Sequence, residues 1–167
     1  MTFNLPILLL AAIIPLILGF IWYHPKVFGT VWMNASGLNA ESMKGVNMVK
    51  IFSLTFIFSF IAALAMQFVV IHQFHMYSIL ANEVGIKDPT SEIGMYLKNF
   101  MDKYGNNFRT FKHGALHGTI TGIFLIFPII GINGLFERKS FKYILINAGF
   151  WTVSLALMGG IICGYDK

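Results

Sequence analysis

The sequence contains very little charge and almost no cysteine. Charged residues make up only 11% of its 167 positions, whereas a soluble domain carries about 25%. The single cysteine, Cys163, has no partner for an internal disulfide bond. Hydrophobic residues, in contrast, make up 56% of the chain. A soluble domain of this length has too small an interior to bury so much apolar surface, so the composition predicts a membrane protein.

The few charges are mostly basic, with 12 lysines and arginines against 7 aspartates and glutamates. The basic residues are spread over several short loops and form no stripe beside stacked aromatic residues, which argues against a nucleic-acid partner. Scattered basic charge of this kind favours anionic lipid headgroups, and the lipid bilayer is therefore the expected environment.

Four long apolar runs predict an all-α integral membrane protein. They cover about residues 5–23, 49–71, 114–132 and 143–163, and charged residues occur only at their flanks. Each run is long enough to cross about 30 Å of hydrocarbon at about 1.5 Å per residue. Backbone groups in lipid must be paired within their own segment, so we expect four transmembrane helices that form one bundle, a single domain over residues 1–167.

The longest connection, about residues 72–113, is expected to lie outside the membrane. Within it, apolar residues recur at helical spacing from Ile93 to Tyr104, after a helix start signal at Asp88-Pro89. We therefore expect a short amphipathic helix in this extramembrane loop. It could lie on the membrane surface or pack onto the bundle, and packing onto the bundle is the simpler expectation.

The distribution of basic residues predicts the orientation in the membrane. The loops at about residues 24–48 and 133–142 share one side, and with their flanks they carry as many basic residues as the long loop and the C-terminus together. The first set is concentrated in shorter loops, which favours a cytoplasmic position for those two loops. Both termini and the long loop would then lie outside.

An aromatic motif follows the first apolar run. Tryptophan and tyrosine prefer the headgroup region, proline ends a helix, and glycine permits a turn. The motif therefore predicts an interfacial anchor, and the alternative is a lipid-headgroup or membrane-enzyme site in this first loop. Its residues are Trp22, Tyr23, His24, Pro25, Phe28, Gly29 and Trp32.

Two stretches of the chain resemble a known family. They are GFIWYHPKVFGTVWM at residues 19–33 and NGLFERKSFKYILINAGFWTVSLALMGGIICGY at residues 133–165. Together they resemble a family of small bacterial membrane proteins catalogued as domain of unknown function 1761, in which a WY-x-P-x-x-F-G-x-x-W-type motif follows the first helix. The resemblance implies a helical bundle in the bacterial cytoplasmic (inner) membrane, and it carries over no established activity.

Small residues in the third apolar run predict close helix packing. On a helical wheel, Gly114, Gly118 and Gly122 share a small and polar face, opposite a bulky apolar face that suits lipid. This spacing brings a second helix close, either inside the bundle or between subunits. Asn147 in the fourth run is expected to form a hydrogen bond to a neighbouring helix.

Four histidines are expected to converge at one end of the second and third helices. His72 and His75 end the second run, and His113 and His117, one turn apart, begin the third. Both of these helix ends lie on the same side of the membrane. The simpler expectation is that these histidines are polar end-caps that bind water, carbonyl groups and lipid. The alternative is a transition-metal site, because neutral imidazoles suit zinc, copper or nickel.

No catalytic motif accompanies these histidines. The sequence has no nucleophile elbow, no phosphate-binding loop and no His-Glu metal helix, so we do not expect an enzyme. The first functional expectation is a packing or accessory component of the membrane that forms a homo-oligomer or attaches to a larger complex. The alternatives are a small transporter or metal-handling protein that uses the four histidines, and a headgroup-binding or enzymatic site in the first loop.

Overall fold

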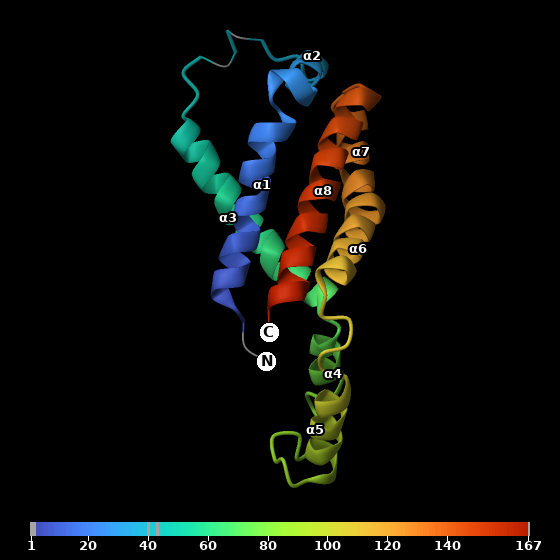
Figure 1. The fold of residues 1–167 in the computed structure, drawn as a ribbon. Helices are drawn as coiled ribbons and strands as arrows, with labels where there is room; N and C mark the ends of the chain where they lie inside the picture. The colour runs from blue at the N-terminus through green and yellow to red at the C-terminus, as the bar shows by residue number, and fades with distance from the viewer. Residues whose placement is uncertain (1–2, 40, 43, 167) are drawn as a thin grey trace.

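The computed structural model describes residues 3–166 with the exception of residues 40 and 43, and these residues form helices and loops without any strand (Figure 1). Four helices are long and apolar enough to cross a membrane, which confirms the predicted all-α membrane fold. They are α1 (Leu5–Trp22), α3 (Met48–Val70), the continuous helix Phe111–Phe136 and α8 (Phe141–Tyr165).

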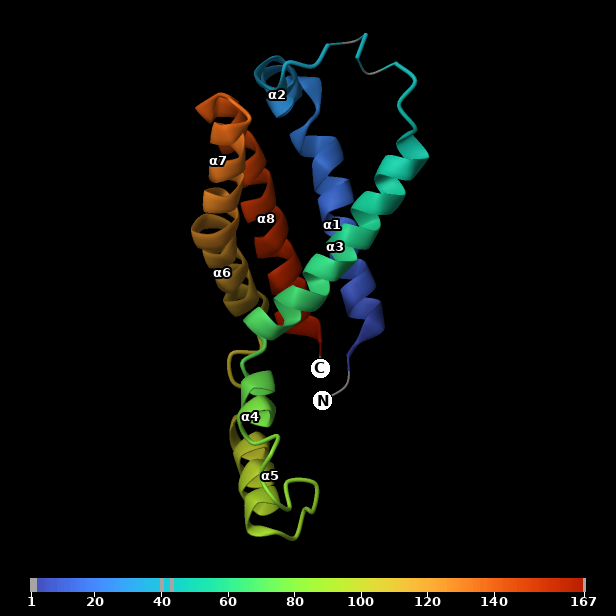
Figure 2. The same cartoon turned by 180° about the vertical axis from the view of Figure 1, so that it is seen from behind.

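Helix α8 is the central element of the fold. It packs against α1 and α3 on one side and against the helix Phe111–Phe136 on the other (Figures 1 and 2). Half of the residues in its most apolar stretch are buried, compared with 11% for Phe111–Phe136. The outer helices therefore direct most of their apolar side chains outward, as expected for helices that meet lipid. The core residues are Leu8, Ala11, Ala63, Met66, Val70, Ile71, Leu155, Met158, Ile162 and Cys163.

Each spanning helix begins after a polar residue whose side chain accepts a hydrogen bond from the first turn. Thr110, for example, accepts from the backbone N–H of His113 at 3.2 Å. Because these caps stand before the apolar runs, three of the helices begin one to three residues earlier than the runs predict. The four caps are Asn4, Asn47, Thr110 and Ser140.

The third spanning helix contains a wider turn in its middle. It consists of α6 (Phe111–Thr121), the π-helical turn η2 (Gly122–Ile126) and α7 (Phe127–Phe136). Pro128, in the first turn of α7, has no backbone N–H to donate, and its ring crowds the preceding turn. A π-helical turn accommodates such an interruption, so the helix continues to Phe136 rather than ending near residue 132.

Three glycines of the third spanning helix lie directly against α8. A Cβ atom added at Gly114 would overlap the backbone carbonyl of Gly159, and one added at Gly118 would overlap the carbonyl of Leu155. A Cβ atom added at Gly122 would also collide with α8. The glycine face is therefore occupied by a helix of the same chain, which brings the two backbones close together.

The two ends of the bundle carry different connections. At one end, the first loop folds into the π-helical turn η1 (Pro25–Gly29) and helix α2 (Thr30–Ser36). There, Lys139 Nζ of the third loop donates a hydrogen bond to the carbonyl of Ser36 at 2.8 Å. At the other end lie both ends of the described chain and a pair of short helices, α4 (Gln73–Ile79) and α5 (Glu92–Tyr104) (Figure 1).

Helix α5 is the amphipathic helix expected in the long loop. Ser91 caps it by accepting a hydrogen bond from the backbone N–H of Gly94 at 3.0 Å, so the helix begins three residues after the Asp88-Pro89 signal. Helices α4 and α5 project beyond the ends of the spanning helices (Figure 2), and the expectation that α5 packs onto the bundle is therefore wrong. The apolar side of α5, which includes Leu97, faces α4 and the loop between them instead.

Candidate metal centre

Three histidines meet where the second and third spanning helices approach each other. His72 directly follows Ile71, the residue that caps the end of α3, and it precedes the first residue of α4. His113 and His117 lie one turn apart in α6, which places both side chains on the same face of that helix. The three ligands therefore come from two segments that are far apart in the sequence.

The three side chains present their Nε2 atoms to one another. The Nε2 atom of His72 lies 2.9 Å from that of His113 and 3.3 Å from that of His117. The candidate ligand atoms of all three histidines lie within 4.8 Å of one another. A neutral imidazole has only one N–H donor, so His72 Nε2 cannot donate to both neighbours at once. At most one of the two close contacts of His72 Nε2 can therefore be a full hydrogen bond.

This spacing is close to that of imidazoles on one tetrahedral metal ion. Zinc–nitrogen bonds of about 2.0–2.1 Å place tetrahedral ligand nitrogens about 3.3–3.4 Å apart. The separations of 2.9 and 3.3 Å from His72 Nε2 approach this value. Two of the three nitrogen–nitrogen distances are therefore already near those expected around one ion.

The fourth predicted ligand does not join the cluster. His75 lies in the first turn of α4, and its ring centroid is 6.3 Å from the ring centroid of His72. The group whose ligand atoms converge contains His72, His113 and His117 but not His75. The break in the helix at Ile71 explains this difference, because it turns α4 away from the end of α3 and carries His75 with it (Figure 2).

The surroundings of His72 favour its neutral form. Partial burial lowers the pKa of His72 below its ordinary value, and the neighbouring His117 and His75 lower this pKa further because like charges repel. The imidazole of His72 therefore remains neutral, and able to bind a metal cation, to a lower pH than a free histidine. His72 is exposed and the other two histidines are half-buried, so the cluster is accessible from the side of His72.

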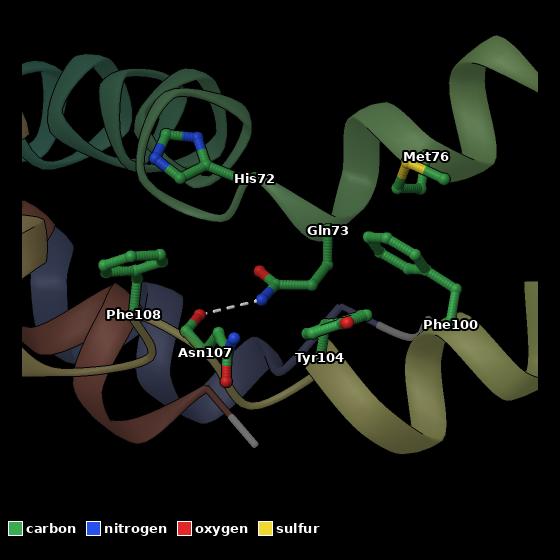
Figure 3. Close-up of a pocket in the computed structure, with 7 residues that line it drawn as sticks. All are labelled: His72, Gln73, Met76, Phe100, Tyr104, Asn107 and Phe108. Atoms are coloured by element: carbon green, nitrogen blue, oxygen red, sulfur yellow. Dashed lines mark hydrogen bonds between the residues drawn. The ribbon is translucent and has the colours of Figure 1, made fainter.

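A cavity of about 380 Å³ adjoins His72 between α4 and α5 (Figure 3). The side chain of Gln73 points between these two helices, and its Nε2 donates a hydrogen bond to the carbonyl of Asn107 at 2.9 Å. The cavity shows that the two helices are loosely packed at the end nearest the bundle. Its other lining residues are Met76, Phe100, Tyr104 and Phe108.

The aromatic motif lies at the opposite end of the bundle and packs against α8. Trp22 Nε1 donates a hydrogen bond to the carbonyl of Ile146 at 3.1 Å. The ring centroids of Trp22 and Phe28 lie 4.7 Å apart, and those of Tyr23 and Trp32 lie 5.0 Å apart. The hydrogen bond holds the motif against the fourth spanning helix, and the two ring pairs pack within the motif.

The other residues of the motif shape the turn after α1. His24 Nδ1 accepts a hydrogen bond from the backbone N–H of Lys26 at 3.2 Å, and Pro25 begins η1. A Cβ atom added at Gly29 would overlap the carbonyl of Tyr23, so only glycine fits where the turn closes. His24 is thus used in the local turn, and the structure places it at the end of the bundle opposite the three-histidine cluster (Figure 1).

Asn147 forms a hydrogen bond between helices. The Tyr23 hydroxyl donates to Asn147 Oδ1 at 2.9 Å, and Asn147 Nδ2 donates to the carbonyl of Tyr143, one turn earlier in α8, at 2.8 Å. The side-chain amide is therefore used both as a donor and as an acceptor. Its partner is the residue that directly follows α1, so Asn147 belongs to the same anchor as the aromatic motif.

The structure also contains a buried polar pair that sequence reasoning missed. Asp166, only 7% exposed, accepts a hydrogen bond from Gln67 Nε2 of α3. The Oε1 atom of Gln67 is buried and has no hydrogen-bond partner among the described residues. Asp166 lies beyond the fourth apolar run, and no local pattern indicates that it turns back against α3. Only the position of Gln67 within an apolar run was a signal that this residue needs a polar partner.

Comparison with known proteins agrees with the resemblance seen in the sequence. Neither a search of curated proteins nor a search of solved structures found a match. A family model described as "Protein of unknown function (DUF1761)" matches residues 7–163, which include the aromatic motif, the three-histidine cluster and the glycine face. The resemblance is thereby confirmed, and the chain belongs to the DUF1761 family.

Proposed function

We propose that the protein is a non-enzymatic membrane protein that binds a transition-metal ion through His72, His113 and His117. One observation carries this proposal: three Nε2 atoms from two distant segments converge, with separations from His72 of 2.9 and 3.3 Å. Without an ion, His72 Nε2 can form a full hydrogen bond with only one of its two neighbours, because it has a single proton or a single lone pair to share. A shared cation gives each imidazole the partner that its lone pair needs.

The ligand set favours zinc, copper or nickel over magnesium or calcium. Neutral imidazoles bind the first group, whereas magnesium and calcium prefer oxygen ligands. Among the described residues, the converging group contains only histidines and no carboxylate. Three protein ligands leave one position of a tetrahedral ion open to water or another ligand, whereas a structural site closes all four positions. We therefore favour metal handling over a purely structural metal site.

The proposed location is the bacterial inner membrane, with the histidine cluster on the outer side. The support is the denser basic charge of the two loops at the opposite end of the bundle. A single cysteine introduced at exposed Glu83 should react with a membrane-impermeant maleimide in intact cells. Labelling that occurs only after the cells are lysed would show the opposite orientation, with the histidine cluster on the cytoplasmic side.

An accessory role in a larger membrane complex is the second candidate. The glycine face does not support a homo-oligomer, because α8 of the same chain covers it. The outer faces of the spanning helices expose many large apolar side chains, and these could meet either lipid or another membrane protein. Native mass spectrometry of gently solubilised membranes tests this candidate, because a partner would appear as a defined additional mass.

The decisive test of metal binding measures zinc in purified protein without an affinity tag. After zinc loading and desalting, elemental analysis should find about one zinc ion per chain. A triple variant with His72→Gln, His113→Gln and His117→Gln should retain almost none. His24→Gln is the matched control, because it removes a histidine from the other end of the bundle and should retain zinc like the wild type. Wild-type protein that retains no zinc would overturn the proposal.

A further inference from the structure

The three-histidine cluster lies at the base of the extramembrane hairpin formed by α4, α5 and their connection. The chain leaves the bundle through a first stem at residues 71–73 and returns through a second stem at residues 107–113. His72 lies in the first stem, and His113 lies where the second stem enters α6. From this placement we propose that a bound metal ion connects the two stems and thereby determines how well ordered the hairpin is. This inference rests on the proposed function.

The hairpin contacts the bundle near its stems, where Phe74 of α4 packs beside Phe68 of α3. Helices α4 and α5 project beyond the spanning helices (Figures 1 and 2), and neither is among the helices that pack along one another in the described part of the bundle. A hydrogen bond from Gln73 to Asn107 connects the two stems. The cavity between α4 and α5 leaves them loosely packed just beyond this bond (Figure 3). A hairpin attached in this way depends strongly on any further connection between its stems.

The second stem also contains a strained residue beside the cluster. Phe108 has a φ of 61°, a left-handed conformation that is unfavourable for a bulky side chain. Its ring lies 5.1 Å from the ring of His113, and its carbonyl accepts a hydrogen bond from the Cys163 thiol at 3.3 Å. The conformation of this stem is therefore linked directly to the position of a metal ligand.

A metal ion would add a strong connection at this point. It would join His72 to residues 41 and 45 positions further along the chain, and so close the loop that contains the whole hairpin. Closing a long loop removes many conformations of the open state, which is why a metal bridge between distant segments has a large ordering effect. The histidine contacts without an ion cannot have this effect, because the nitrogen atoms offer few donors to one another.

Hydrogen–deuterium exchange of the complete protein in lipid nanodiscs tests the inference. Zinc at saturating concentration should slow exchange of the amides at residues 73–80 and 104–110 at least about tenfold, a change equal to about 1.4 kcal/mol in the opening equilibrium. Exchange within α8 should remain the same. A chelator should reverse the protection, and magnesium should produce none. Both controls use the wild-type protein, so the measurement does not depend on a variant that could fold poorly.

Two variants separate this inference from the proposed function. His117→Gln should lose zinc-dependent protection of the hairpin, whereas His24→Gln should keep it. If calorimetry shows that zinc does not bind, the proposed function fails and the inference fails with it. If zinc binds to all three histidines and hairpin exchange does not change, the inference alone is overturned and metal binding stands.

Discussion

The two ends of the bundle differ in how their polar side chains are paired. At the first-loop end, Tyr23 donates a hydrogen bond to Asn147, and Trp22 donates one to a carbonyl of α8. At the other end, His72 and His113 bring chemically identical nitrogen atoms to 2.9 Å. A hydroxyl or indole N–H and an oxygen acceptor complete each other, whereas His72 Nε2 has a single proton or a single lone pair for two neighbouring imidazoles. This difference separates a structural anchor from a candidate ligand site.

The largest expected effect is the loss of stability when a glycine of the glycine face is replaced, because both ends of the bundle depend on this helix contact. Gly118→Ala would drive a methyl group into the carbonyl of Leu155, and overpacking of this kind costs about 3 kcal/mol. Thermal unfolding in detergent, followed by tryptophan fluorescence, should show a large fall in the midpoint. We expect both the zinc affinity and the first-loop anchor to be affected, because α6 and α8 support both ends.

The matched control for that variant is Gly131→Ala in the same spanning helix. A Cβ atom there would lie 3.9 Å from Ile144 Cγ2, an ordinary contact. Alanine is also the better helix former, so this variant should be as stable as the wild type or slightly more stable. Equal losses of stability in the two variants would contradict the role of the glycine face.

The second prediction distinguishes the two ends by their response to zinc. His113→Gln should weaken zinc binding about 10- to 100-fold, because it removes one of three ligands. The unfolding midpoint of the metal-free protein should change little, since the half-buried His113 ring lies beside Phe108 and His117, which a glutamine side chain can also contact. Competition with a fluorescent zinc indicator measures the affinity, and unchanged affinity would contradict the assigned ligand.

The sequence predicts those features of the fold that a lipid environment requires, above all the helical state of the apolar runs. Four apolar runs had to be helices, and the structure confirms four helices of sufficient length. The boundaries were less predictable, because Thr110 and Ser140 start their helices before the apolar run begins. The projection of α5 was not predictable either, since it depends on the break at Ile71 and on contacts between α4 and α5.

The sequence predicts where the candidate site lies, but it does not predict which of the four histidines converge there. Chain topology alone places the end of the second helix beside the start of the third, so the convergence of histidines could be inferred. The direction of α4 then decides which histidines meet, and no local pattern at Ile71 or His72 indicates this direction. The partner of the glycine face was missed as well, although Gly159 and Gly160 in α8 were a visible signal of close packing.

The third prediction concerns the anchor at the first-loop end. Asn147→Leu keeps a similar volume and removes the acceptor of the Tyr23 hydroxyl, which should lower the free energy of unfolding by about 1 kcal/mol. Zinc affinity should remain the same as in the wild type. A double-mutant cycle with Tyr23→Phe measures the pair directly, and a coupling energy near zero would show that the hydrogen bond does not stabilise the anchor.

The smallest expected effect is that of His75→Gln. His75 lies beside the cluster but outside the group of converging ligand atoms, so its loss should change zinc affinity less than about threefold. The indicator competition used for His113→Gln measures both variants under the same conditions. The ratio between the two effects is the informative quantity, because both variants remove one histidine from the same end of the bundle.

A tenfold loss in His75→Gln would change the assignment in a specific way. It would mean that α4 rotates when an ion binds, so that His75 supplies a fourth ligand and closes the tetrahedral position that three histidines leave open. The site would then have the closed ligand set of a structural zinc site, and the argument against a purely structural metal site would fail. A loss below threefold would instead leave three ligands and an open position, and it would sharpen the contrast with the hydrogen-bonded pairs of Tyr23 and Trp22 at the other end.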